Sequence, residues 1–159
     1  MIFSACASVP KGVQPVNGFD LGRYLGVWHE IARLDHSFER GLTKVTAEYS
    51  MRDDGGVKVL NKGFDKEKNK WKEAEGRAYF IGDKSVGSLK VSFFRPFYGG
   101  YNIIELDKEN YQYALVAGPS RSYLWILARD PALPSATIEK LVLKARELGF
   151  ETDKLIFPK

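Results

Sequence analysis

Hydrophobic and polar residues alternate along most of this chain in short runs, which turn-forming residues interrupt about every 10 to 15 positions. Such alternation predicts antiparallel strands, because successive side chains of a strand point to opposite faces of its sheet. The run Asp53-Asp54-Gly55-Gly56 is typical of a tight hairpin between two strands. The pattern predicts eight strands, over residues 24–34, 43–52, 56–64, 70–81, 87–95, 99–106, 110–118 and 122–129.

One amphipathic helix is expected after these strands. Ser135 is its expected N-cap, and Gly149 is expected to end it. Its apolar stripe, which we expect to pack on the sheet, consists of Ile138, Leu141, Val142, Ala145 and Leu148. A last strand over residues 150–156 is expected to extend the sheet. Strands at this spacing are typical of an antiparallel barrel or sandwich. The predicted fold class is all-β, an eight-stranded antiparallel up-and-down β-barrel with one C-terminal α-helix packed on its wall. A closed barrel of eight strands can hold one small ligand.

Strand parity, the alternation of side chains between the two faces of a strand, predicts which of them face the barrel interior. Over residues 70–81 small apolar residues alternate with charged ones, and small inward residues leave space where a packed core would hold large ones. The side chains expected to face the interior are mostly apolar with a few polar groups, as in small-molecule pockets. A filled interior without a cavity is the alternative. The expected lining consists of Glu30, Ala32, Ala47, Tyr49, Gly76, Ala78, Phe80, Leu89, Val91, Phe93, Tyr113, Tyr123 and Trp125.

Glu30 is the one carboxylate in this expected lining, and a carboxylate in an apolar barrel needs a partner. Tyr113 or another inward tyrosine could supply one. A structural polar network near the barrel floor is the favoured interpretation, and a role in ligand binding or proton transfer is the alternative.

Composition excludes several classes of function. The chain has 159 residues, the length of one domain, and no run reaches the roughly 18 to 20 apolar residues of a membrane helix. A net charge of +4 is too small, and too scattered, to indicate nucleic-acid binding. No catalytic motif, phosphate-binding loop or metal-ligand spacing occurs, and His29 and His36 are the only histidines. We therefore expect no enzyme activity, no metal and no cofactor.

The single cysteine, Cys6, excludes an internal disulfide. Its context Phe3-Ser4-Ala5-Cys6 resembles a bacterial lipoprotein box, in which the cysteine is lipidated and becomes the mature N-terminus. A free thiol in an unprocessed leader is the alternative. Residues 8–16 hold two prolines, a glycine and no periodicity, which indicates an extended tether. The expected organisation is a leader over residues 1–18 and one domain over residues 19–159.

Three motifs in order resemble those of the lipocalins. Gly26-x-Trp28 matches the first lipocalin motif, the segment from Leu106 to Val116 resembles the second, and Arg129 matches the third. The resemblance implies that Trp28 closes the barrel floor and that Arg129 packs across it. A guanidinium over an indole gains about 0.5–2 kcal/mol of cation–π energy.

Within this family the chain looks like the bacterial lipocalins, relatives of apolipoprotein D. The segments that carry the likeness run over residues 28–33, 35–41 and 113–119. The likeness implies an outer-membrane lipoprotein facing the periplasm, anchored through Cys6, that binds fatty acids or lysophospholipids for lipid storage or transport.

The resemblance also predicts which loops surround the open end of the barrel. These loops carry Arg40, Lys66, Lys68, Lys70, Arg95 and Arg121 against Asp35, Glu39, Asp65 and Glu67. A cationic rim would favour anionic head groups. The alternative function is an envelope protein whose barrel mediates protein contact or self-association, for instance as a homodimer. Expected exposed aromatic residues for that role are Phe97, Tyr98 and Tyr101.

Overall fold

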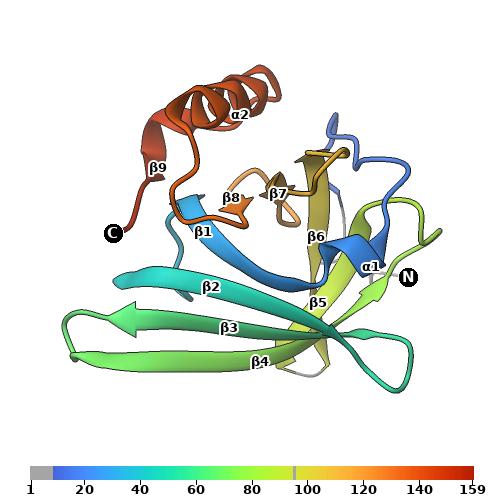
Figure 1. Ribbon diagram of the computed structural model, residues 1–159, viewed down its shortest axis with the longest axis horizontal. Coiled ribbons are helices and arrows are strands. Elements are labelled where there is room, and N and C mark those ends of the chain that lie inside the picture. The colour runs from blue at the N-terminus through green and yellow to red at the C-terminus, as the bar shows by residue number, and fades with distance from the viewer. Residues whose placement is uncertain (1–8, 95) are drawn as a thin grey trace.

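The computed structural model describes residues 9–94 and 96–159. Within these residues eight strands close into a barrel, and a helix and a short ninth strand lie outside it (Figure 1). The strands are β1 (Gly26–Leu34), β2 (Leu42–Met51), β3 (Val57–Asp65), β4 (Lys70–Phe80), β5 (Ser88–Phe94), β6 (Phe97–Leu106), β7 (Tyr113–Ala117), β8 (Leu124–Ala128) and β9 (Leu155–Ile156). The helices are α1 (Leu21–Tyr24), α2 (Ser135–Glu147) and the 3₁₀ helix η1 (Thr152–Lys154).

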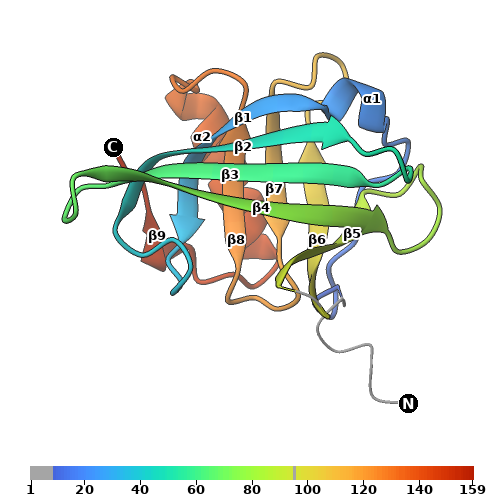
Figure 2. The same ribbon diagram turned by 90° about the horizontal axis from the view of Figure 1, so that it is seen from below.

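The barrel closes through β1. From β1 to β8 each strand pairs antiparallel with the one that follows it in sequence, and β1 also pairs with β8, which closes the barrel. This topology confirms the predicted eight-stranded antiparallel barrel. Figure 2 shows β2, β3 and β4 as one long wall that crosses the direction of β6, β7 and β8. The short strand β9 pairs with Arg33 and Leu34, where β1 no longer pairs with β2.

Local turns shorten several predicted strands. The first begins at Gly26 because α1 occupies residues 21–24, and Gly26 itself has a φ of +100°, which favours glycine. The seventh begins at Tyr113 because the Asp107 carboxylate accepts the backbone N–H groups of Asn110 and Gln112 and closes a turn there. The predicted last strand is reduced to β9, since η1 occupies residues 152–154.

Two hydrophobic clusters sit on opposite faces of the barrel wall. One fills part of the interior, and the other lies between the wall and α2. Leu141 and Ala145 of α2 are fully buried in the second cluster, which confirms that the helix packs on the wall. The predicted N-cap is wrong: Pro134 precedes the helix, Ser135 is its first residue, and no side chain caps it. No helix in the described part of the chain is long and apolar enough to cross a membrane.

A β-bulge in β1 reverses the predicted parity of its last residues. Glu30 pairs with Leu127 of β8, but Ala32 pairs with Ile126, so the register shifts by one between them. Ala32 is therefore buried in the cluster under α2 and not in the barrel interior. Arg33 comes to lie beside Glu30 instead, with its Nη1 atom 2.7 Å from Glu30 Oε2.

Residues 9–18 are packed along the barrel, unlike the extended tether that composition predicted for residues 8–16. Val13 is buried in the cluster shared with α2. The backbone N–H of Val16 donates to Ile103 O, and Val16 O accepts the N–H of Gly87. At the other end of this segment the Arg121 guanidinium donates to Lys11 O. The segment thus covers the outside of the barrel before α1 begins.

Candidate functional site

The barrel encloses a cavity of about 110 Å³ whose lining is mostly apolar. A single water needs roughly 10–15 Å³ on this measure, so the cavity has room for a chain of several groups of that size. It is lined by Phe19, Leu21, Tyr24, Glu30, Glu39, Val45, Ala47, Tyr49, Val57, Val59, Asn61, Ala78, Leu89, Val91, Phe93, Tyr101, Val116, Trp125 and Leu127.

Strand parity predicts much of this lining. Eight of the thirteen expected residues line the cavity: Glu30, Ala47, Tyr49, Ala78, Leu89, Val91, Phe93 and Trp125. They come from β1, β2, β4, β5 and β8, where the alternation of side chains is regular. The remaining five expected residues lie elsewhere, each for a local reason.

Tyr113 and Ala32 face the outer wall. The hydroxyl of Tyr113 accepts a hydrogen bond from Lys140 Nζ of α2 at 3.2 Å, so it cannot be the partner of Glu30. Tyr123 lies in the β7–β8 loop, where it stacks on Trp125 with a ring-centroid distance of 6.3 Å. Both tyrosines were expected inside. Tyr113 instead shares the outward face of β7 with Leu115 and Ala117, and Tyr123 precedes β8, where strand parity does not apply.

Gly76 and Phe80 face inward but do not reach the cavity. A Cβ atom on Gly76 would lie 2.7 Å from Ser92 O and 2.8 Å from the ring of Phe93. Glycine at this position therefore makes room for the Phe93 side chain, which itself lines the cavity. Phe80 packs on Phe19 at the closed end, with a ring-centroid distance of 6.1 Å.

The closed end of the barrel is formed by Trp28 and Arg129. Trp28 is fully buried, and the guanidinium carbon of Arg129 lies 4.1 Å from its ring centroid. The same guanidinium donates to Val27 O at 3.0 Å and to Arg23 O at 2.8 Å. A Cβ atom on Gly26 would lie 3.2 Å from Arg129 Nη1, so glycine leaves space for this contact. The geometry is the one that the lipocalin resemblance implies for these residues.

Three tyrosine hydroxyls meet just above this floor. The Tyr101 hydroxyl lies 2.6 Å from that of Tyr24 and 2.7 Å from that of Tyr49. Burial raises the pKa of all three phenols, so they are neutral hydrogen-bonding groups at neutral pH. Sequence reasoning placed Tyr101 on an exposed patch and missed Tyr24. The alternation of Tyr101 with Ile103 in β6 was a usable signal for the inward orientation, since both belong to the interior cluster.

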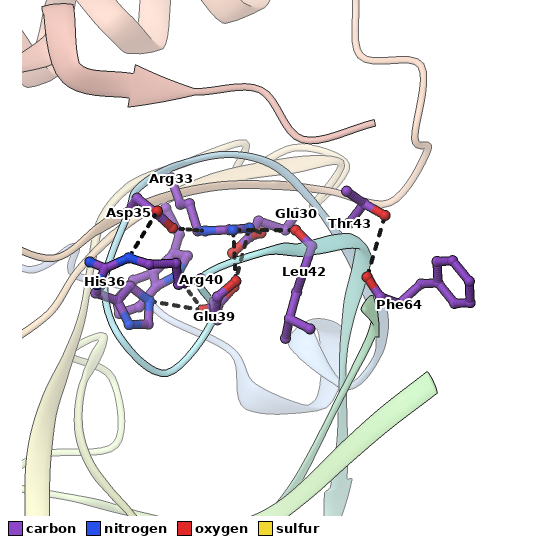
Figure 3. A network of polar contacts seen from close by, with 10 residues as sticks. Glu30, Arg33, Asp35, His36, Glu39, Arg40, Leu42, Thr43 and Phe64 are labelled. Carbon is purple, nitrogen blue, oxygen red and sulfur yellow. Dashed lines mark hydrogen bonds and ion pairs between the residues drawn. The ribbon is translucent and has the colours of Figure 1, made fainter. Parts of the chain in front are cut away.

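The open end carries a buried polar network around Glu30 and Glu39 (Figure 3). Arg33, with 1% of its side chain exposed, donates from Nη1 to Glu30 Oε2 at 2.7 Å and from Nε to Asp35 Oδ1 at 3.1 Å. Glu39 Oε1 accepts the Trp125 indole N–H at 2.9 Å and lies 3.1 Å from His36 Nε2. The partner of Glu30 is thus an arginine brought close by the β1 bulge, and not the tyrosine that was expected.

The two carboxyl groups of this network differ in how readily they ionise. Burial, together with the neighbouring Glu39, raises the pKa of Glu30 well above its ordinary value. Burial opposes ionisation of Glu39 too, but hydrogen bonds from His36 and Glu30 lower the pKa of Glu39 to about 2. Of the two, Glu30 therefore favours the protonated form and Glu39 favours the ionised form.

The expected cationic rim is not what faces the cavity. Arg121 is engaged elsewhere, donating to Leu148 O at 2.9 Å and to Lys11 O at 2.6 Å. Arg95 lies outside the described residues. Among the described residues that line the cavity, none is Lys or Arg, whereas two are glutamates. The ionisable groups at the open end of the cavity are therefore acidic.

Exposed aromatic residues gather on two loops at the open end. Phe38 lies between β1 and β2, and Phe94 and Phe97 flank the β5–β6 turn, each with more than two thirds of its surface exposed. The ring of Tyr98 lies under Lys90 Nζ, 4.9 Å away, and Tyr101 lines the cavity. Of the three aromatics expected on this patch, only Phe97 is strongly exposed.

Comparison with known proteins places this fold in a family. A family model described as a lipocalin-like domain matches residues 19–159. The chain belongs to the lipocalin family. This lipocalin is 53% identical over 157 residues to the outer membrane lipoprotein Blc of Vibrio cholerae, a match covering 99% of this chain and 92% of the relative. It is 57% identical over 157 residues to Blc of Citrobacter freundii, covering 98% of this chain and 88% of the relative.

More distant lipocalins are also similar. Apolipoprotein D of Rattus norvegicus is 36% identical over 131 residues, covering 77% of this chain and 67% of the relative. The solved structure of insecticyanin from Manduca sexta superposes with a TM-score of 0.75 at 21% identity, covering 96% of this chain and 86% of that one. At this identity the superposition shows the shared fold alone.

Proposed function

We propose that this lipocalin binds the single apolar chain of a fatty acid or a lysophospholipid inside its barrel, for lipid storage or transport at the bacterial outer membrane. The observation that carries the proposal is the apolar cavity of about 110 Å³, closed at one end by Trp28 and Arg129. Each methylene group buried there contributes about 0.8 kcal/mol. A chain of several methylenes therefore supplies enough free energy to offset the ordering cost of binding.

The ligand is proposed to enter tail first. The floor offers no exit, because Trp28 is fully buried in contact with both Tyr24 and Arg129. An ionised head group inside the apolar barrel would lose its hydration, at a cost that the methylene contacts do not offset. The head group is therefore expected at the open end, near Glu30, Glu39 and Trp125.

The proposal is for a binding protein and not an enzyme. Among the described residues that line the cavity, no Ser, Thr, Cys or Lys side chain offers a nucleophile. No group of three or more His, Cys, Asp or Glu side chains suited to a metal ion occurs in residues 9–94 and 96–159. The hydroxyl groups of Tyr24, Tyr49 and Tyr101 bond to one another. Glu30 bonds to Arg33, and Glu39 Oε1 accepts the indole N–H of Trp125.

The relatives named outer membrane lipoprotein support a location at the outer membrane. We propose that Cys6, which lies outside the described residues, carries the lipid anchor. Cells expressing the full chain with labelled palmitate are expected to yield labelled protein, and Cys6→Ser is expected to abolish the label. Undiminished labelling of Cys6→Ser would contradict the anchor.

Filling the cavity tests the ligand site. Val91→Trp is expected to remove room for at least two methylene groups and so weaken binding of dodecanoic acid and of a dodecanoyl lysophospholipid by about tenfold or more. Lys90→Trp is the matched control, because the neighbouring side chain faces the opposite side of β5. Calorimetric titration of the delipidated variants with each lipid measures the two affinities. Equal binding by the two variants would place the lipid outside the barrel.

Protein contact or self-association is the second candidate function. The exposed phenylalanines Phe38, Phe94 and Phe97 favour it, since clustered exposed apolar side chains often mark contact surfaces. Native mass spectrometry distinguishes the two candidates. A monomer that retains lipid supports the carrier, and a dimer that binds neither lipid supports self-association.

A further inference from the structure

Glu30 and Glu39 both line the apolar cavity, from different elements of the barrel. Glu30 is on β1, and Glu39 is in the loop between β1 and β2, so the two carboxyl groups converge at the open end (Figure 3). Within the described lining they are the only ionisable groups other than tyrosines. A ligand chain lying in the cavity would therefore place its first polar atoms against these carboxyl oxygens.

The donor nitrogens of Arg33 are all used within the protein. Nε bonds to Asp35, Nη1 to Glu30, and Nη2 to the backbone oxygens of Glu39 and Leu42. Arg33 is also absent from the cavity lining. It neutralises charge in the network, but it does not offer an N–H group to a ligand.

Glu39 Oε2 is the carboxylate oxygen of this network that has no hydrogen-bond donor in the described part of the chain. It is buried, no N–H or hydroxyl group of the described residues bonds to it, and Arg33 Nη1 is 3.8 Å away. Glu30 is the neighbouring carboxyl group on the cavity wall, and its raised pKa favours a proton there that Glu39 could accept. A buried carboxylate oxygen without a donor of its own is an open acceptor for a ligand hydrogen-bond donor.

We propose that Glu30 and Glu39 form a head-group subsite that takes a hydrogen-bond donor directly attached to the ligand chain, above all an ammonium group, in preference to a carboxylate. The inference rests on the proposed function, since it assumes an apolar chain in the barrel, and within that function it ranks a fatty acid below a ligand of the same chain length whose head group carries a donor. On binding, the ammonium N–H groups replace the bridging proton, which leaves Glu30 for solvent. The ligand keeps its own protons, so one proton is released for each ammonium bound, and charge balances.

The groups around the pair are consistent with this exchange. Arg33 and Asp35 flank it on the β1 side, His36 and Arg40 belong to the β1–β2 loop, and the indole N–H of Trp125 reaches Glu39 from β8. Tyr49 of β2 lies near Glu39 and stays protonated. Arg33 pairs with Glu30, and Arg40 pairs with Asp35 at 3.5 Å, so neither cation is available to a ligand carboxylate.

The test is a series of three ligands that share a ten-carbon chain and differ only in head group: decylamine, decan-1-ol and decanoate. Calorimetric titration of the delipidated protein at pH 7 is expected to show one site, with decylamine binding at least about tenfold tighter than decanoate and decanol between them. Repeating the decylamine titration in phosphate and in Tris, which differ in ionisation enthalpy, is expected to show close to one proton released per amine. Decanol is expected to release none and to displace decylamine.

Two variants separate this subsite from general charge effects. Glu30→Gln keeps a donor toward Glu39 but has no proton to lose, so decylamine binding is expected to release none. Glu39→Gln is expected to remove the preference for the amine over decanol. Glu48→Gln, on an exposed position of β2, is the matched control and is expected to behave as the unmodified protein. Because the proton count is measured on the unmodified chain, the test does not depend on the variants folding.

The outcomes distinguish this inference from the proposed function. If none of the three ligands binds, the proposed function fails and the subsite with it. If decanol and decanoate bind inside the barrel but decylamine binds no tighter than decanol, or releases no proton, the carrier function stands and the subsite is overturned. If decanol cannot displace decylamine, the amine is bound to acidic groups on the protein surface and not in the cavity. That result would also overturn the subsite.

Discussion

Replacing Trp28 with alanine is expected to lower the free energy of unfolding by about 3–5 kcal/mol. Trp28 is fully buried, its indole N–H donates to Tyr24 O at 2.8 Å, and its ring lies 4.7 Å from that of Tyr24. Its other face supports Arg129, so truncation leaves both a void and an uncovered guanidinium. Equilibrium unfolding in urea measures the loss.

Trp71→Ala is the matched control, since that tryptophan is on β4 and 50% exposed. It is expected to cost less than about 1 kcal/mol, as most surface substitutions do. A Trp28→Ala variant as stable as Trp71→Ala would show that the floor contributes little to the fold. An Arg129→Met variant in the same series would then separate the cation–π contact, about 0.5–2 kcal/mol, from the packing of the ring.

Arg33→Met is the second substitution with a large expected effect, about 3–5 kcal/mol at pH 7. The arginine is the buried cation of the open-end network, and without it the carboxyl groups of Glu30, Glu39 and Asp35 lose their shared positive partner. Because protonation removes the negative charge that Arg33 compensates, the loss is expected to shrink as the pH falls toward 4.5, the ordinary pKa of a glutamate. Urea unfolding at several pH values measures the trend.

Arg40→Met is the control for Arg33→Met, because Arg40 has 68% of its side chain exposed and pairs with Asp35 at the surface. Its expected cost is about 0–1 kcal/mol, the usual range for a surface ion pair. If Arg33→Met were no more costly than Arg40→Met, or if its cost were the same at pH 7 and pH 4.5, the buried carboxyl groups would not depend on Arg33.

The regular strands were predictable, because one rule relates each side chain to its neighbour two positions away. On β2, β4 and β5 that rule places Ala47, Ala78 and Val91 correctly in the cavity. It fails at Ala32, where the β1 bulge shifts the register by one residue. Strand parity carries no information about a bulge, since the bulge depends on pairing with β8.

The polar part of the site was much less predictable. Glu39 lies in a loop, so no periodicity directs it into the barrel, and Arg33 would have faced outward on a regular strand. The sum of charges on the loops suggested a cationic open end, but it took no account of which charges are already paired. Arg121 illustrates this, because its donors are used by Leu148 O and Lys11 O.

The bond from Arg121 to Lys11 also bears on how the barrel would stand on a bilayer. Arg121 is in the β7–β8 loop at the open end, so it holds Lys11 there, and Val9 packs on the wall nearby. Cys6 lies three positions before Val9, and a fully extended chain spans at most about 3.6 Å per residue. With Cys6 acylated as proposed, Val9 would be kept within about 11 Å of the leaflet surface, which would hold the open end of the barrel on the side that faces the leaflet. A lipid leaving that leaflet would then reach the cavity without crossing open water.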